Sequence, residues 1–143
     1  MHYREFIRTT IENKLLNATL AGANVYNTRA YAVGKSNVPA IIVYTNSEES
    51  EQSTGTKSIR ELSLAIEIYV KKQINPDQEL DDIAQQVEEI LGANNDLDDL
   101  VKIITYEGIE IEQNGDGDNL FFVGTMEYSI LYRVANSDPT ANI

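Results

Sequence analysis

Hydrophobic and polar residues in the first third of the chain follow two different periods. Apolar side chains in residues 3–20 recur near every 3.6 residues, which predicts an amphipathic helix that Gly22 would end. Residues 25–33 fit a first strand, and residues 40–45 form a β-branched run typical of a buried strand. The segment 46–57 is polar and has no apolar residue to anchor it, so we expect a long loop there.

The middle and end of the chain contain the strongest patterns. Apolar and polar residues alternate strictly over residues 61–70, which predicts a strand with one apolar face. Residues 75–92 begin with Asn-Pro-Asp, continue with an apolar stripe and end with Gly, as is typical of a helix. Residues 102–112 and 120–134 are predicted to pair as a hairpin around the turn-rich stretch between them.

The predicted order of elements is α-β-β-β-α-β-β, with no repeat and no linker that would divide the chain. This order is typical of a two-layer α+β fold, in which a mixed or antiparallel sheet carries both main helices on one face. The other face would present Tyr, Thr, Ser and Glu side chains to solvent or to neighbouring subunits. We therefore expect a single domain over residues 1–143, with an untethered tail at residues 135–143.

The chain is strongly acidic. It has 11 Lys and Arg against 23 Asp and Glu, a formal net charge of −12 at pH 7. This charge argues against binding to nucleic acid, which depends on basic side chains, and against anionic membranes. The sequence shows neither a signal-peptide pattern nor an apolar run of roughly 18 residues, so we expect a protein of the cytoplasm in which it is made. Another protein as partner, or a surface that repels passing DNA, agrees better with the charge.

No combination of residues is typical of an enzyme. Cysteine is absent, and the single histidine, His2, follows the initiator Met, where we expect a solvated terminal residue rather than a catalytic base. The segment Asn114-x-Asp116-x-Asp118 has the first ligands of a calcium loop but lacks the Gly and Glu that an EF-hand needs further on. It is predicted to be a hairpin turn instead. The sequence thus predicts no enzymatic activity, no metal site and no cofactor.

The expected polar loop is the first candidate for contacts with a partner. Long loops without secondary structure are uncommon inside compact domains and are often functional. The acidic side chains Glu48, Glu49 and Glu51 would then contact a partner or line a channel. The alternative is that the loop is merely mobile.

Several segments, in their order along the chain, resemble the lambda-like minor tail protein U family, the tail terminators of long-tailed bacteriophages. The resemblance covers roughly residues 3–134 and depends on the order and spacing of its motifs. The motifs are the N-terminal amphipathic helix, Val38-Pro39-Ala40 before an aliphatic strand that ends in Tyr44, the alternating strand after Arg60, Pro76-Asp77-Gln78-Glu79-Leu80-Asp81, and the strand Gly124-Thr125-Met126-Glu127-Tyr128-Ser129-Ile130-Leu131-Tyr132.

The resemblance implies an assembly role. Such proteins form a homo-oligomeric, hexameric ring on the last ring of the major tail-tube protein, stop tube polymerisation and offer a surface to the head–tail connector protein. The protein would then act in the cytoplasm of the bacterial host during assembly and remain in the virion tail. Candidates for the lumen are Glu48, Glu49 and Glu51, and candidates for subunit packing are Tyr26, Tyr31 and Tyr69.

On this interpretation, reversing the three glutamates to Lys is expected to impair DNA passage or tail joining and to leave the fold intact. Two other functions remain open. Another head–tail completion or tail-tube component could share the fold, but a tube protein polymerises along its axis whereas a terminator stops at one ring. A cytosolic acidic adaptor that binds a basic protein would form no ring and would not bind tail tubes.

Overall fold

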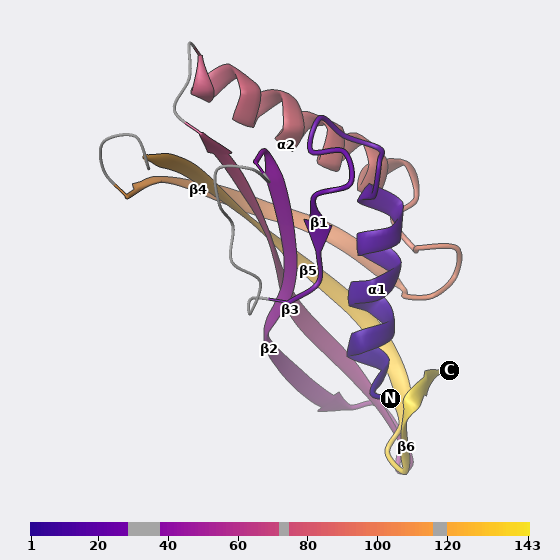
Figure 1. Cartoon of the computed structure of the whole chain (residues 1–143). Helices are drawn as coiled ribbons and strands as arrows, with labels where there is room; N and C mark the ends of the chain where they lie inside the picture. Colours follow the sequence, from indigo (N-terminus) through magenta and orange to yellow (C-terminus); the bar gives the residue numbers. More distant parts are fainter. Residues whose placement is uncertain (29–37, 72–74, 116–119) are drawn as a thin grey trace.

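The computed structural model describes residues 1–28, 38–71, 75–115 and 120–143, which form two helices and a six-stranded sheet. Both helices cover one face of the twisted sheet, and the two termini lie near each other at one end (Figure 1). The predicted α+β class is thus confirmed, with one additional strand at the C-terminus. The elements are α1 (Tyr3–Leu15), β1 (Val25–Tyr26), β2 (Ala40–Gln52), β3 (Lys57–Lys71), α2 (Pro76–Ala93), β4 (Ile103–Asn114), β5 (Phe121–Ala135) and β6 (Asp138–Asn142).

The sheet is mixed, with the order β1-β2-β3-β5-β4, and β6 pairs with β5 beside this path. β1 runs parallel to β2, and the other pairs are antiparallel. β3 and β5 are the long central strands, each of 15 residues. Among the described strands, β4 forms one edge of the sheet. Within the described ranges, β1 pairs with Ile41 and Ile42 alone, so the rest of described β2 lies at the other edge.

The core lies between the helices and one face of the central strands. The apolar residues of the alternating pattern on β3 have no exposed surface, which confirms the strand expected at residues 61–70. Burial of one such aliphatic side chain contributes about 1.5–3 kcal/mol before the entropy of the chain is counted. The same cluster contains Ile7, Ile11 and Leu15 of α1, Leu80, Ile83, Val87 and Leu91 of α2, and Met126, Ile130 and Tyr132 of β5.

The polar segment at residues 46–57 is not the long loop expected from the sequence. β2 continues through the three glutamates to Gln52, and a short turn leads into β3, so that prediction is wrong. The strand persists without apolar side chains because its main-chain groups pair with β3, where Glu49 lies opposite Glu61. The sheet ladder, which depends on residues distant in sequence, therefore overrides the local composition.

α1 is shorter than the helix predicted at the N-terminus. It ends at Leu15, because Leu16 has an extended backbone and Asn17 has a φ of 57°. The amide of Asn17 donates to the carbonyl of Gly22 at 2.8 Å, which closes the following turn. Leu16 fitted the helical period, yet it is 40% exposed, and Leu20, where the predicted helix ended, is 55% exposed.

The C-terminal segment is also more ordered than the untethered tail expected at residues 135–143. Asp138–Asn142 form β6 against the end of β5, and the amide of Ile143 donates to the carbonyl of Arg133 at 2.9 Å. The segment is small and polar, so its pairing through the main chain left no alternating pattern in the sequence.

The predicted hairpin near the C-terminus is confirmed by the antiparallel pair β4–β5. Its turn lies outside the described residues, and with it Asp116 and Asp118 of the calcium-like motif. The first predicted strand, residues 25–33, is described only as far as Thr28 and contains β1.

The connection from α2 to β4 contains consecutive residues with positive φ: Leu97 at 50°, Asp98 at 60° and Asp99 at 69°. This left-handed backbone costs a residue with a Cβ about 1–2 kcal/mol, whereas glycine adopts it readily. Asp99→Gly is therefore expected to raise the free energy of unfolding in urea by about 0.5–1 kcal/mol. Asp96→Gly is the control, because Asp96 is outside the positive-φ set and should lose stability. Stabilisation by both changes would contradict the backbone explanation.

Candidate functional site

The face of the sheet that carries no helix collects carboxylates from four strands. On β3, every second residue points to this face, between the buried residues of the core. The strand registers place residues of β2, β5 and β4 beside them, including Glu49 opposite Glu61. We call this surface the acidic face; its carboxylates are Glu49, Glu51, Glu61, Glu67, Glu107, Glu110, Glu112 and Glu127.

The middle of the acidic face contains a hollow of about 320 Å³. Glutamates from all four strands line it, so its charge comes from residues far apart in the sequence. The serines between them add hydroxyl groups, one of which, Ser129 Oγ, donates to Glu61 Oε1 at 2.9 Å. The lining comprises Ser47, Glu49, Glu61, Leu62, Ser63, Glu107, Glu127, Tyr128 and Ser129.

Two β-bulges flank this hollow, one on each edge of the sheet. β2 has an extra residue, Asn46, and β4 has an extra residue, Glu107. A bulge redirects a side chain, and here Glu107 lines the hollow while Asn46 Nδ2 donates to Glu127 Oε2 at 3.1 Å. Gly108 makes the bulge on β4 possible, since its φ of 153° is rarely adopted by residues with a Cβ.

The carboxylates of the acidic face repel one another. Burial raises the pKa of Glu127, and the nearby charges of Glu110 and Glu67 raise it further, while the hydrogen bond from Asn46 opposes them. In the described part of the chain, no group of three or more acidic or histidine side chains is arranged to hold a metal ion. The face can therefore repel anions and attract cationic groups.

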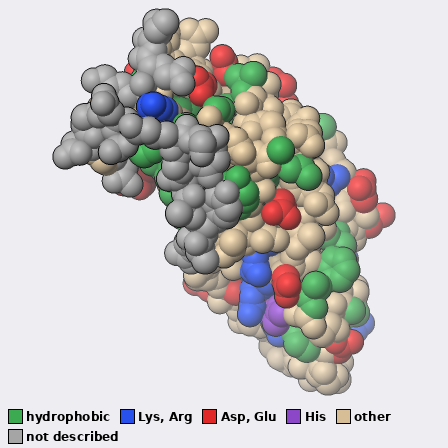
Figure 2. Space-filling model, viewed as in Figure 1, with side chains coloured by type: hydrophobic (Ala, Val, Ile, Leu, Met, Phe, Trp, Pro, Cys, Tyr) green, Lys and Arg blue, Asp and Glu red, His purple; other side chains and the backbone are tan. Residues whose placement is uncertain are grey.

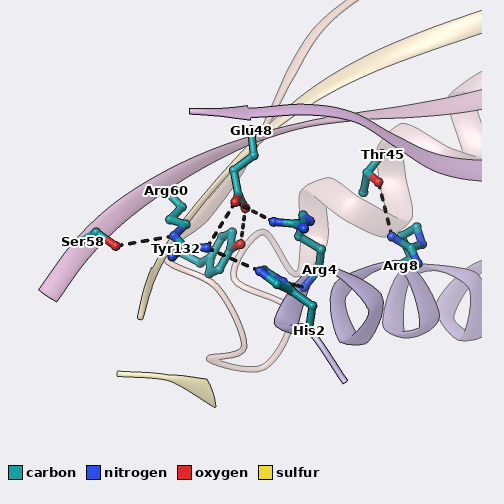
Figure 3. A network of polar contacts seen from close by, with 8 residues as sticks. All are labelled: His2, Arg4, Arg8, Thr45, Glu48, Ser58, Arg60 and Tyr132. Carbon is teal, nitrogen blue, oxygen red and sulfur yellow. Dashed lines mark hydrogen bonds and ion pairs between the residues drawn. The ribbon is translucent and has the colours of Figure 1, made fainter. Parts of the chain in front are cut away.

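Glu48 points to the opposite face, toward α1 (Figure 3). Its carboxylate lies 2.7 Å from Arg4 Nη1 and 3.3 Å from Arg60 Nη1, and it accepts a hydrogen bond from the hydroxyl of Tyr132. The side chains of Glu48 and Arg60 are only 13% and 16% exposed. Glu48 thus joins the N-terminal helix to the β2–β3 hairpin, whereas Glu49 and Glu51 lie on the acidic face.

His2 belongs to the same polar network and is the N-cap of α1. Its Nδ1 accepts a hydrogen bond from the amide of Arg4 at 3.1 Å, and its Nε2 lies 3.4 Å from Arg60 Nη1. Figure 2 shows the histidine beside basic side chains at this end of the molecule. Burial, together with the charges of Arg4 and Arg60, lowers the pKa of His2, and Glu48 opposes the shift. His2 is therefore the helix cap and not the solvated terminal residue expected from the sequence. Histidine is not among the residue types preferred at this position, so the sequence carried no signal for the role.

The described tyrosines predicted to pack subunits lie at the other end of the acidic face. Tyr26 of β1 lies opposite Ile42 of β2, and Tyr69 of β3 donates its hydroxyl to Glu67 Oε2 at 2.7 Å. Burial and the bond to Glu67 raise the pKa of Tyr69. Tyr44 shares this end and was missed by the sequence analysis. We call Tyr26, Tyr44 and Tyr69 the aromatic end; Tyr31 lies outside the described residues.

The aromatic end extends away from the acidic hollow along the sheet. Tyr44 lies beside the hollow, because it is opposite Ala65 of β3, which is opposite Glu127 of β5. Tyr69 is eight residues along β3 from Glu61, which corresponds to about 26 Å. The part of the face around Tyr69 can therefore serve a different contact from the hollow. Neither described helix is both long and apolar enough to cross a membrane.

The chain is similar to a known protein family and to solved structures. The model of the family described as phage minor tail protein U matches residues 2–132. Among solved structures, the chain is similar to one in the virion of a native gene transfer agent particle, with 10% identity and a TM-score of 0.43, over 87% of this chain and 93% of that chain. No curated protein sequence matches. Because the family match includes both helices and the central strands, the chain belongs to the phage minor tail protein U family, whose members are non-enzymatic structural components of the virion tail.

Proposed function

We propose that the protein is a tail terminator. A closed, hexameric ring of subunits caps the major tail-tube protein, stops its polymerisation and offers its other side to the head–tail connector protein. The ring assembles in the cytoplasm of the bacterial host, and the chain acts in it as a single domain. Membership of the minor tail protein U family supports this role.

The observation that carries the proposal is the collection of carboxylates on one face of the sheet. A ring that turns the acidic face toward its axis has a negatively charged lumen, which repels the phosphates of DNA in transit. Glu49 and Glu51 keep the lumen role expected from the sequence. Glu48 is removed from it, because its carboxylate is bound to Arg4 and Arg60 on the opposite face.

A ring also needs a heterologous interface, in which one surface of a subunit meets a different surface of the next. The aromatic end is our candidate for one of these surfaces. Tyr26, Tyr44 and Tyr69 are half-buried, so each exposes part of its ring to a neighbour. Tyrosine is enriched in protein interfaces because it combines apolar area with a polar tip.

Light scattering over a range of protein concentration tests the ring directly. We expect a discrete species near six times the 16.0 kDa chain, free in solution or on added tail tubes, without larger polymers. Open-ended growth would instead indicate a tube component. A monomer that also fails to bind tail tubes would favour an acidic adaptor for a basic protein.

Charge reversal on the acidic face tests the lumen. We expect Glu49→Lys/Glu51→Lys to fold normally and to lower the infectivity of phage that depend on this protein by roughly tenfold or more. Asp81→Lys/Asp82→Lys, on the exposed side of α2, makes the same change in net charge away from that face. Equal infectivity of both double variants and the parent would remove the lumen assignment.

A further inference from the structure

β4 is an edge strand with an open outer side. It contains 12 residues, and in the described part of the chain it pairs only with β5. At its start, the amide of Ile104 donates to the carbonyl of Asn95 at 2.7 Å, so the open stretch begins after this residue. Main-chain groups along such an edge can pair with an extended segment that adds to the sheet.

The side chains of β4 form two rows of different chemistry. On the side that faces α2, Tyr106 is 39% exposed and Ile111 is 51% exposed. Ile109 lies between them and is only partly buried against the core. On the acidic face, Glu110 and Glu112 are exposed. The edge is thus apolar on one side and acidic on the other, with the period of two of a strand.

Edge strands often carry charges and bulges that prevent pairing with other chains. The bulge at Glu107 and the two exposed glutamates agree with such protection. The exposed side chains of Ile111 and Tyr106 do not agree with it, because uncovered apolar side chains favour contact with another chain. Selective pairing explains both rows, because the apolar row favours binding of another strand and the glutamates restrict binding to strands without opposing negative charges.

We propose that β4 binds, by strand addition, an extended segment of another protein in which Lys or Arg alternate with apolar residues. Directly opposed side chains on neighbouring strands interact, so the basic residues would lie beside Glu110 and Glu112. The apolar residues of the segment would cover Tyr106 and Ile111. This contact does not depend on ring formation.

The occupant is a different protein because a second copy of this chain has the wrong charge. Among the described strands, the other long open edge is the end of β2, which has the sequence Asn-Ser-Glu-Glu-Ser-Glu-Gln and no basic residue. In a continuous sheet, this edge would place Glu49 and Glu51 beside the glutamates of β4. Like charges directly opposite each other destabilise a strand pair.

The test uses the full chain and two fluorescent ten-residue peptides, one alternating Lys with Val and one alternating Glu with Val. Fluorescence anisotropy should detect binding of the Lys–Val peptide alone, and the amide NMR signals of β4 should shift. Glu110→Lys/Glu112→Lys should weaken its binding roughly tenfold or more and create binding of the Glu–Val peptide. Both residues are exposed, so this variant should fold, which a urea titration verifies.

The control is Asp81→Lys/Asp82→Lys, which changes the net charge equally on α2 and should leave the affinity unchanged. An equal loss of affinity in the control would mean that the peptide responds only to the net charge of the protein, and it would overturn the proposal. Absence of binding, or shifts confined to other strands, would do the same. Changes of the β4 signals with protein concentration alone would identify a second copy as the occupant, also against the proposal.

Discussion

Glu48→Lys is expected to lower the free energy of unfolding by about 2–4 kcal/mol in a urea titration. The carboxylate of Glu48 accepts hydrogen bonds from Arg4, Arg60 and Tyr132. A lysine at this position would place a third cation between two guanidinium groups in a largely buried site. Loss of one partner of a fully buried ion pair costs more free energy than the value expected here. Arg4, however, is 35% exposed, so water offsets part of the loss.

The neighbouring substitution Glu49→Lys is the matched control. Its side chain lies on the opposite face of the same strand, is exposed, and has Glu61 directly across on β3. Stability should change by less than about 0.5 kcal/mol, or rise slightly as the repulsion is relieved. Similar losses from both variants would mean that β2 tolerates no cation, and that the Glu48 network has no special role. Reversal of all three glutamates is accordingly not expected to leave the fold intact.

This difference between adjacent glutamates shows where the sequence stops being informative. Apolar alternation identified β3 and its buried face, because Leu62 and Leu64 must leave water. The polar end of β2 has no such preference, and its strand depends on pairing with β3. Once the strand is known, the period of two sends Glu48 toward α1 and Glu49 away from it. The missing information was the partner strand, which no local pattern contains.

The acidic face was predictable to a similar extent. Glu61 and Glu127 alternate with apolar residues, so a surface carrying Glu was expected on the outer side of the sheet. The bulges at Asn46 and Glu107 shift the alternation by one residue, and only Gly108 hinted at the second. β1 lies beside β2 through a parallel pair, a non-local arrangement, and it brings Tyr26 to the face that carries Tyr69.

Two buried tyrosines on β5 are expected to respond in opposite ways to loss of the hydroxyl. Tyr132 is fully buried and donates its hydroxyl to Glu48, while its ring lies 5.5 Å from that of Tyr3. Tyr132→Phe keeps the ring contact but removes a hydrogen bond to a charged group. The free energy of unfolding should fall by about 1.5–3 kcal/mol.

Tyr128 is 3% exposed on the same strand and face, yet its hydroxyl has no hydrogen-bond partner among the described residues. Burial of an unpaired polar atom is costly, and phenylalanine fills the same space without it. Tyr128→Phe should therefore raise the free energy of unfolding by about 1 kcal/mol. Its ring contact with Tyr106, at 5.5 Å between centroids, is preserved.

Urea titrations of the two Tyr→Phe variants and the parent measure both effects under one condition. The substitutions remove the same atom from the same strand, so differences in chain entropy or ring packing largely cancel. Only the partner of the hydroxyl differs, and the signs should therefore differ. Loss of stability in Tyr128→Phe would mean that its hydroxyl is paired in solution. Burial raises the pKa of Tyr128, and the charge of Glu88 on α2 raises it further, so Glu88 would be the first acceptor to test.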